Sequence, residues 1–423
     1  MNAAPSGSPV VVQKYGGTSV ASADRICAVA DRLLRARETH RRLVVVVSAM
    51  GTTTDELVAL AHKVSGKPEG REMDLLLATG EQVAVSLLGL ALQGRGVTAI
   101  SLTAMQCGIR TDDVFSIARI ESIDISRIVA ELDRERVVII TGFQGLTRDQ
   151  EITTLGRGGS DITGAALAAA LGAKVCEICT DVDGVLSADP NLVPNAQRWQ
   201  EITYREAIEM AASGAKVLHP RAAEVCMAYN IPIHVRSSFH DREGTWIRGE
   251  DDMVMEKAAV VGVSSDRNIA KITLTDVPDR PGLAAQVFQD LAARDISVRL
   301  IIQSASAEGL GRITFVLDDA YVEPAADLVE RWKSQQVARD AVVERDVATI
   351  SIIGSRLAST PGLAARMFAV LGREGINIDC ISSSEMKVAC VIADTHVDRA
   401  VQTVHEEFFT IEALGSTDAA TGS

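Results

Sequence analysis

The feature that most constrains the fold is an internal repeat in the C-terminal part of the chain. The pentapeptide Pro281-Gly-Leu-Ala-Ala285 returns as Pro361-Gly-Leu-Ala-Ala365, 80 residues later. Around each copy the pattern runs strand, Pro-Gly turn, amphipathic helix and strand, then a further strand and helix. This order predicts two domains on the β-α-β-β-α-β plan, whose sheets can pair side by side or across a dimer. No catalytic pattern accompanies the repeat, so we expect a binding module.

The sequence before the repeat follows a different pattern. Short β-branched runs alternate with longer helical stretches. The runs are Val10–Gln13, Leu43–Val47, Val137–Thr141 and Lys174–Cys179, and the helical stretches include Ser22–Arg37, Asp55–Val64 and Ile162–Leu171. Strands that are apolar on both faces and separated by helices predict a mainly parallel, open α/β sheet covered by helices on both sides.

These patterns divide the chain into six segments. We predict flexible tails at residues 1–8 and 415–423, an α/β catalytic domain at 9–239, and a polar linker at 240–257. The two repeat domains would then occupy residues 258–340 and 341–414. The polar, turn-rich composition of the linker is typical of a domain boundary.

Composition narrows the range of functions. The net charge of −14 argues against a nucleic-acid partner, because a phosphate backbone favours clustered Lys and Arg. The apolar run Val83–Leu92 is too short to span a bilayer, and the first residues lack a signal-peptide pattern. Seven scattered cysteines suit a reducing compartment, so we expect a cytoplasmic protein. Cys176 and Cys179 form a lone CxxC inside a predicted strand, which indicates buried thiols rather than a metal site.

The first chemical motif is a strand that ends in Lys14 and is followed by Gly16 and Gly17. Glycines let backbone N–H groups approach phosphate oxygens, and the helix that follows adds positive potential. Lys14 could neutralise charge on a transferring phosphoryl group. An ordinary strand-to-helix turn would also explain two glycines.

The second motif places Arg157 between glycines and follows it with Ser160 and Asp161 at the start of an Ala-rich helix. The guanidinium could hold a carboxylate in bidentate fashion, and Asp161 could orient Lys14 or a metal ion. A helix cap alone would need only one of these polar residues.

The third motif is a strand end that releases Thr180 and Asp181 onto a turn-rich loop. The carboxyl ends of parallel strands are where open α/β sheets bind ligands. A surface loop with common Asp-Gly and Asp-Pro turns is the simpler interpretation.

Taken in order, the motifs resemble those of aspartate kinases, which belong to the amino-acid kinase superfamily. They are KYGGTSV at 14–20, SAMGTTTDEL at 48–57, ATGEQ at 78–82, GFQG at 142–145, TTLGRGGSD at 153–161, TDVDGV at 180–185, GAKVLHP at 214–220 and VRSSF at 235–239. The repeat is similar to the tandem ACT domains of these enzymes, which are ferredoxin-like. The resemblance covers nearly the whole chain.

The resemblance implies roles for individual residues. Lys14 and Asp161 would be catalytic, and Gly16, Gly17, Thr180, Asp181 and Lys216 would join Lys14 at the ATP phosphates and nucleotide. Aspartate would be held by Ser48, Thr54, Glu81, Phe143, Arg157 and Ser160, with Arg157 on the α-carboxylate and Glu81 on the amino group.

The implied reaction is ATP plus L-aspartate giving ADP and 4-phospho-L-aspartate, with Mg²⁺ as the usual charge-neutralising ion. It opens the route to lysine, threonine, methionine and isoleucine. A carboxylate nucleophile needs no general base at neutral pH, which agrees with a site rich in cationic and N–H groups. Two alternatives stay open: another amino-acid or nucleotide kinase, and a decayed kinase that acts as an amino-acid-binding regulator. The joint presence of Lys14, Arg157 and Asp161 favours catalysis.

The resemblance also implies regulation by an amino acid bound near Asp279, Pro281, Gly282 and Leu283. Relatives that sense lysine often carry acidic residues near the positions of Leu283 and Arg299, so we expect threonine rather than lysine as the effector. We expect a homodimer through the ACT domains. Met253 and Met255 could also start a short regulatory subunit of an α2β2 assembly.

The loop after TDVDGV departs from the family pattern. Relatives usually carry Tyr and Arg where this chain has Leu186 and Asn191. Because a charged hydrogen bond to phosphate is then missing, we expect a KM for ATP above that of relatives with Tyr and Arg, and a larger share of the phosphate contact for Lys216.

Overall fold

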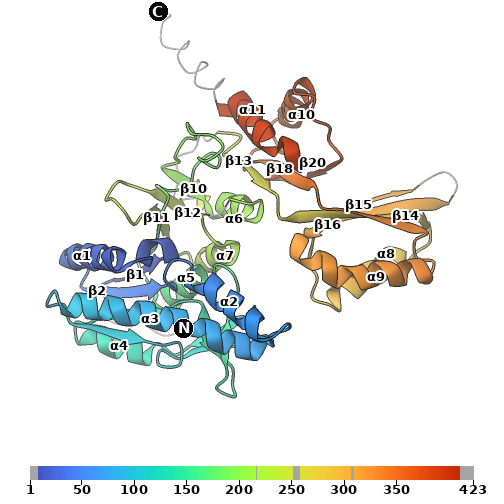
Figure 1. The fold of residues 1–423 in the computed structure, drawn as a ribbon. Helices are drawn as coiled ribbons and strands as arrows, with labels where there is room; N and C mark the ends of the chain where they lie inside the picture. Colours follow the sequence, from blue (N-terminus) through green and yellow to red (C-terminus); the bar gives the residue numbers. More distant parts are fainter. Residues whose placement is uncertain (1–7, 216, 251–257, 306–308, 410–423) are drawn as a thin grey trace, which may run out of the picture. The chain divides into compact units, whose positions relative to one another are not determined.

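The computed structural model describes residues 8–215, 217–250, 258–305 and 309–409 (Figure 1). They form two compact units. The first unit contains the described residues up to Leu186, Arg198–Ala212 and residues 217–250. The second contains Ser187–Gln197, Ser213–Ala215 and residues 258–409. Lys216, Met253 and Met255, which the sequence singled out, lie outside the described residues.

The first unit is built on an eight-stranded sheet with the order β10-β12-β11-β9-β1-β2-β6-β3. The strands are β1 Val10–Tyr15, β2 Arg42–Val47, β3 Ala99–Leu102, β6 Val137–Thr141, β9 Val175–Thr180, β10 Glu201–Thr203, β11 Ile233–Ser237 and β12 Thr245–Arg248. All neighbours pair in parallel except β11 and β12. The predicted mainly parallel sheet is therefore confirmed.

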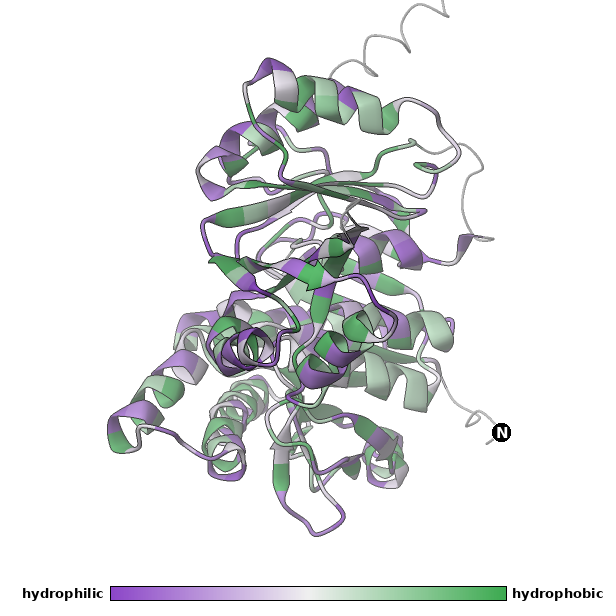
Figure 2. Cartoon of the chain, turned by 90° about the vertical axis from the view of Figure 1, so that its right-hand side faces the viewer, coloured by the Kyte–Doolittle hydropathy of each residue, from purple (hydrophilic) through white to green (hydrophobic). Residues whose placement is uncertain are grey.

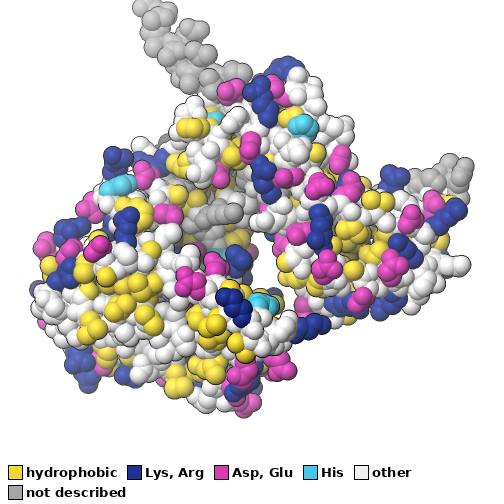
Figure 3. Space-filling view, viewed as in Figure 1, with side chains coloured by type: hydrophobic (Ala, Val, Ile, Leu, Met, Phe, Trp, Pro, Cys, Tyr) yellow, Lys and Arg dark blue, Asp and Glu magenta, His cyan; other side chains and the backbone are white. Residues whose placement is uncertain are grey.

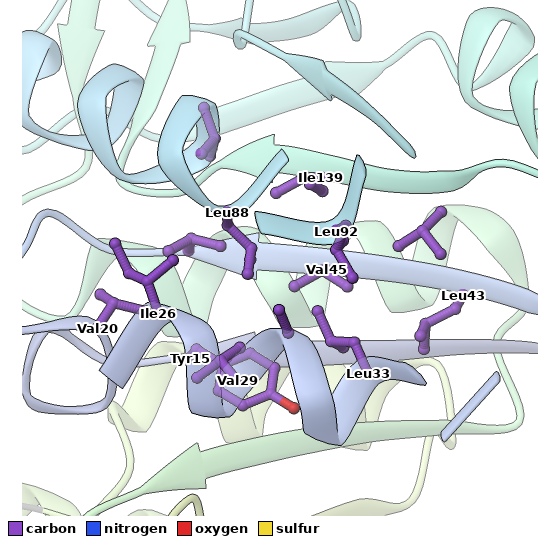
Figure 4. Close-up of a cluster of buried hydrophobic side chains, with 14 of the residues drawn as sticks. Tyr15, Val20, Ile26, Val29, Leu33, Leu43, Val45, Leu88, Leu92 and Ile139 are labelled. Atoms are coloured by element: carbon purple, nitrogen blue, oxygen red, sulfur yellow. The ribbon is translucent and has the colours of Figure 1, made fainter. Parts of the chain in front are cut away.

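Helices cover both faces of this sheet. They are α1 Ala23–Thr39, α2 Thr53–Val64, α3 Gly70–Gln93, α4 Ser126–Asp133, α5 Gly159–Leu171, α6 Tyr204–Ala212 and α7 Pro220–Ala228, with a 3-10 turn η1 at Gly17–Val20. On one face Leu33 of α1 and Leu88 of α3 pack with Tyr15 and Val45 of the sheet in a single buried cluster (Figure 4). On the other face α5 lies against β1, β2 and β9. Alternate residues of β1 thus face different helix layers.

Helix α3 is long and apolar enough to cross a membrane by length and composition alone. Half of its most apolar 18-residue window is buried, and Leu88 and Leu92 belong to the core cluster beneath it. Core helices of globular domains share this composition. Leu75, Val83, Leu87 and Leu90 remain exposed, and hydrophobic side chains gather on the surface where α3 runs (Figure 3).

A second, smaller sheet of the first unit has the order β5-β4-β7-β8. Its strands are β4 Ile109–Thr111, β5 Ile120–Ile123, β7 Gln144–Leu146 and β8 Ile152–Thr154. Each has only three or four residues, which is too short for a period-two pattern to show in the sequence. This sheet was not predicted.

The second unit contains the two repeats as predicted. The first comprises β14 Ile269–Pro278, α8 Leu283–Ala292, β15 Val298–Ala305, β16 Leu310–Asp318, η3 Asp319–Tyr321, α9 Val322–Ser334 and β17 Asp340–Glu344. The second comprises β18 Val347–Ile353, α10 Leu363–Arg373, β19 Cys380–Ser383, β20 Lys387–Ala393, η4 Asp394–His396 and α11 Val397–Phe409. The helices at the top of Figure 2 change between hydrophilic and hydrophobic along their length, as amphipathic helices do.

The sheets of the two repeats are not built in simple chain order. The first has the order β15-β16-β14-β17, and the second has the order β13-β18-β20-β19. Strand β13 (Gly262–Asp266) precedes the first repeat in sequence but pairs antiparallel with β18 of the second. Strand β13 lies in the predicted segment 258–340 but belongs to the sheet of the second repeat. Strand β17 extends past residue 340 but belongs to the sheet of the first repeat.

The segment Ser187–Gln197 leaves the first unit in sequence and packs within the second. Ser187 is fully buried, and its Oγ lies 2.8 Å from Nε2 of His405 on α11. The Val263 N–H donates to the Ser187 carbonyl at 2.8 Å, and the Gln402 amide donates to the Leu192 carbonyl at 3.0 Å. These hydrogen bonds tie the segment to β13 and α11.

Candidate active site

The predicted site residues converge on one edge of the large sheet. Strands β9, β1, β2 and β6 are neighbours and run parallel, so their carboxyl ends meet at the same edge. Thr180 ends β9 and Asp181 follows it, Gly16 and Gly17 follow β1, Ser48 follows β2, and Gly142-Phe143 follow β6. This edge is where open α/β sheets bind ligands.

Lys14 and Asp161 form an ion pair at this edge. Lys14 is the fifth residue of β1 and points to the α5 face, where its Nζ lies 2.6 Å from Oδ1 of Asp161 in the first turn of α5. The Lys14 and Asp161 side chains are 12% and 10% exposed. The backbone N–H of His219 donates to Oδ2 of Asp161 at 3.2 Å. The two charges are therefore held in place before any substrate arrives.

Glycines bring the start of α5 close to its neighbours. Gly158 has φ +70°, and a Cβ there would lie 2.5 Å from Cδ2 of His219. A Cβ on Gly142 would lie 2.5 Å from the Ser160 hydroxyl. No side chain among the described residues caps α5, but the N–H groups of Gly159 and Asp161 donate to the Gly156 and Gly158 carbonyls at 2.9 and 3.0 Å, so the Gly-rich turn itself closes the helix start. Arg157 stands exposed beside this helix end and has no hydrogen bond or ion pair with any described residue.

The glycine loop after β1 packs tightly on the end of β2. A Cβ on Gly17 would lie 2.9 Å from the Ala49 carbonyl oxygen, so a larger residue would push the loop away. The Gly51 N–H donates to the Gly17 carbonyl at 3.1 Å. The loop continues into η1, where the Ser19 hydroxyl hydrogen-bonds the Ser238 hydroxyl at 2.8 Å. This geometry suits a loop whose backbone approaches phosphate closely.

Glu81 is a buried carboxyl on α3 at the same edge. Its side chain accepts a hydrogen bond from the Ala49 N–H at 2.9 Å, while Oε2 has no partner among the described residues. Burial raises its pKa to about 7, although the backbone N–H bonds act in the opposite direction. A buried carboxyl with a free oxygen can receive a substrate ammonium group.

Phe143 has an unusual backbone conformation for a bulky residue. Its φ is +71°, in the left-handed region. The conformation is held by its N–H, which donates to the Thr163 hydroxyl at 3.1 Å, and by its carbonyl, which accepts from the Leu155 N–H at 2.8 Å. Strain that the surroundings enforce in this way is concentrated at functional sites. It supports the assignment of Phe143 to a ligand site.

The remaining predicted residues are placed more loosely. The Thr180 hydroxyl donates to Asp181, which is exposed, at 3.1 Å. Thr54 lies in the first turn of α2. Leu186 forms an isolated bridge with Arg198, and the Asn191 amide bonds the Asp189 carboxylate at 2.9 Å within the second unit.

Sequence reasoning missed Asp74, which supports the site from α3. Asp74 is fully buried, and its carboxylate accepts from the N–H and hydroxyl of Ser116 at 2.8 and 3.3 Å and from those of Thr154 at 2.7 and 2.9 Å. It thereby fixes the strand that leads into the Arg157 loop. The signal available in the sequence was a single Asp within the apolar stretch before ATGEQ.

The predicted effector residues lie in the second unit at the turn between β14 and α8. Asp279, Pro281 and Gly282 are exposed, and Gly282 caps α8 with φ +95°. Leu283 is different, because its side chain is 4% exposed and belongs to the core of the first repeat. Gly362 and Leu363 repeat this arrangement at α10.

Comparison with known proteins agrees with this architecture. The amino acid kinase family model matches residues 9–237, and ACT domain models match residues 271–335 and 350–408. The chain is 43% identical to the aspartokinase of Mycolicibacterium smegmatis, over 97% of this chain and 98% of that one, and 46% identical to that of Thermus thermophilus, over 94% and 98%.

Its structure resembles E. coli aspartokinase III in complex with aspartate and ADP, with a TM-score of 0.81 and 29% identity over 95% of this chain and all of that one. The kinase fold, the paired ACT domains and the near full-length similarity lead to one conclusion: the chain belongs to the aspartokinase family of amino acid kinases.

Proposed function

We propose that the first unit transfers the γ-phosphoryl group of ATP to the side-chain carboxylate of L-aspartate. The observation that carries the proposal is the Lys14–Asp161 ion pair at the carboxyl edge of the sheet, in the first turn of α5. The aspartokinase relatives and the aspartate- and ADP-bound structural neighbour support the choice of substrates.

The geometry divides the work among few groups. The N–H groups after β1 cradle the phosphates, and the Lys14 ammonium stabilises the charge that develops on the phosphoryl group in transfer. Arg157, which is free of protein partners among the described residues, binds the α-carboxylate, and Glu81 receives the α-ammonium. The aspartate side chain is already ionised at neutral pH, so it attacks without a general base.

Mg²⁺ would enter with ATP. Within the described residues, no group of three His, Cys, Asp or Glu side chains is placed to hold a metal ion. Mg²⁺ on a nucleotide needs only one or two protein carboxylates beside phosphate oxygens and water, and Asp161 and Asp181 at the sheet edge fit that demand. When bound, the ion neutralises phosphate charge. The prediction of a cytoplasmic enzyme stays a prediction.

Lys14→Ala tests the assignment. We expect kcat to fall by at least two orders of magnitude, because a preorganised charge on the reacting group is lost. Lys63→Ala, which removes an exposed lysine from the last turn of α2, is the matched control and should keep wild-type kcat. A folded Lys14→Ala protein with near-normal kcat would refute the proposal.

The second unit would bind an amino-acid effector and dimerise. Exposed N–H groups at the starts of α8 and α10 can receive a carboxylate. Arg299 is ion-paired with Asp266 and Asp318, so it repels a lysine ammonium less than an unpaired arginine would. Threonine remains our predicted effector. An ADP-release assay with lysine, threonine or methionine added shows which of the three amino acids inhibits the enzyme. Strong submillimolar inhibition by lysine alone would contradict it.

A further inference from the structure

A row of polar side chains crosses four strands on the α1 face of the large sheet. Gln13 of β1 lies opposite Glu177 of β9, Glu177 opposite His234 of β11, and His234 opposite Trp246 of β12. The Gln13 amide donates to Glu177 at 2.6 Å, and the His234 and Trp246 rings stack at 4.2 Å. Strands of a parallel sheet are usually covered on both faces, so their side chains are mostly apolar. A row of polar side chains at these positions therefore suggests a role other than packing.

Three of the four residues of the row line a pocket of about 550 Å³. The lining comprises Glu177, His234 and Trp246 from the row, with His40, Lys174, Val175, Pro232, Arg236 and Arg248 around it. Lys174 precedes β9, and His40 ends α1, so the pocket opens toward the amino ends of the strands. Thr180 lies six residues beyond Lys174 along an extended strand, about 20 Å away. The pocket is thus separate from the active site.

Positive charge dominates the pocket. The basic side chains of the lining are Lys174, Arg236 and Arg248, and Glu177 is the one carboxylate among its described residues. Burial would raise the Glu177 pKa, but His234 and Arg236 beside it lower it below its usual value, so Glu177 is ionised and offsets one cation. Among the described residues, neither Lys174 nor Arg248 has an acidic partner. Uncompensated cations stand out in a chain of net charge −14.

Two buried polar atoms at the pocket lack partners. His234 is 5% exposed, yet its Nε2 has no hydrogen bond among the described residues, and the same holds for Nε of Arg236. Buried polar atoms are almost always satisfied, so two unsatisfied nitrogens on lining residues add to the polar character of this region. The guanidinium of Arg248 lies 4.4 Å from the centroid of the Trp246 ring, which His234 also stacks on. Because the Trp246 ring already stacks with His234 and Arg248, it is not free to stack on a nucleobase. The pocket therefore suits a compact charged ligand better.

We propose that this pocket binds a compact multivalent oxyanion, a phosphate or a small di- or tricarboxylate, between Lys174, Arg236 and Arg248. The strands hold the cations at fixed spacing, which favours binding of a preformed anion shape. All the lining residues belong to the first unit, and the proposal holds whether or not the proposed reaction is correct.

Calorimetric titration of the full chain tests the proposal, with saturating ADP and aspartate to fill the active site. Phosphate, pyrophosphate, malonate and citrate are the probes, with acetate at matched ionic strength as the reference. We expect at least one multivalent probe to bind and to change Trp246 fluorescence. Trp246→Phe should abolish the fluorescence change. Binding of only the phosphate probes would support the site and identify a phosphate ligand. Binding of only malonate or citrate would support it and identify a carboxylate ligand.

The double variant Lys174→Gln/Arg248→Gln should raise the dissociation constant at least tenfold, because two charged contacts are removed. Both side chains lie at the pocket rim, so the variant should fold and keep wild-type kcat. Lys63→Gln, which removes a single charge from α2, should leave binding unchanged. Absence of binding by all four probes, or equal binding by the double variant, would overturn the proposal.

Discussion

Glu81 links the pH dependence of aspartate binding to the stability of the fold. Its pKa of about 7 means that the carboxyl is mostly protonated at pH 6 and mostly ionised at pH 8. Only the ionised form can pair with the substrate ammonium, so kcat/KM for aspartate should rise roughly tenfold between these pH values. A pH–rate profile of the wild type measures this, and a flat profile would contradict it.

Glu81→Gln is the control for the pH dependence of kcat/KM and for the pH dependence of stability, because the amide does not ionise. It should lower kcat/KM for aspartate and remove the limb of the profile near pH 7. In the wild type the folded pKa exceeds the usual 4.5, so stability falls as pH rises from about 4.5 to 7, by about 3 kcal/mol in all. The variant lacks this loss, so its melting temperature at pH 8 should exceed that of the wild type.

Helix α5 offers a comparison between two glycines of similar backbone conformation. Gly158 begins the helix with φ +70° and touches His219, while Gly172 ends it with φ +57°, where a Cβ would meet no described atom within 4 Å. Gly158→Ala should displace His219, whose N–H holds Asp161, and lower kcat at least tenfold. Gly172→Ala should cost about 1 kcal/mol of stability and leave kcat unchanged. Equal kcat in the two variants would show that the contact with His219 does not matter.

Elements with a strong local pattern were predictable from the sequence. Predicted strands at Val10–Gln13 and Val137–Thr141 correspond to β1 and β6, and predicted helix Ser22–Arg37 corresponds to α1 within two residues at each end. Both faces of these strands are buried, so the apolar run is long and clear. Helix α3 was not predicted as a unit, because its apolar residues spread around much of its circumference.

Features that depend on distant pairing could not be read locally. The partner of β13 is set by register with β18, about ninety residues later, which no local period encodes. At the site, the motifs identified Lys14 and Asp161, and the structure shows that they meet. Asp74 was not predicted as a site residue, because the four groups that donate to it come from Ser116 and Thr154, which are remote in sequence.

At the scale of the whole chain, His405 ties the segment after the nucleotide loop to the second unit. His405 is 3% exposed and contacts Ser187, and burial lowers its pKa. The fold therefore favours the neutral ring, and stability should be lost as pH falls below about 6.5, the ordinary pKa. His405→Gln cannot titrate, so its melting temperature should drop less than that of the wild type between pH 7 and pH 5.

His62→Gln, on the surface of α2, controls for loss of a histidine as such and should follow the wild type. If His405→Gln follows the wild type too, the buried ring does not contribute to acid sensitivity.

The placement of β13 has a mechanical consequence. Because β13 and β18 share one sheet, the chain leaves the second repeat domain, builds the whole first repeat domain and returns. Two short links, Arg267-Asn268 and Arg345-Asp346, are the covalent connections between them. A buried cluster also joins the two sheets, with Ile269, Leu300 and Val316 from the first and Val347 and Val391 from the second. The two repeat domains are thus fastened by chain and by core together, so a displacement of one is passed directly to the other.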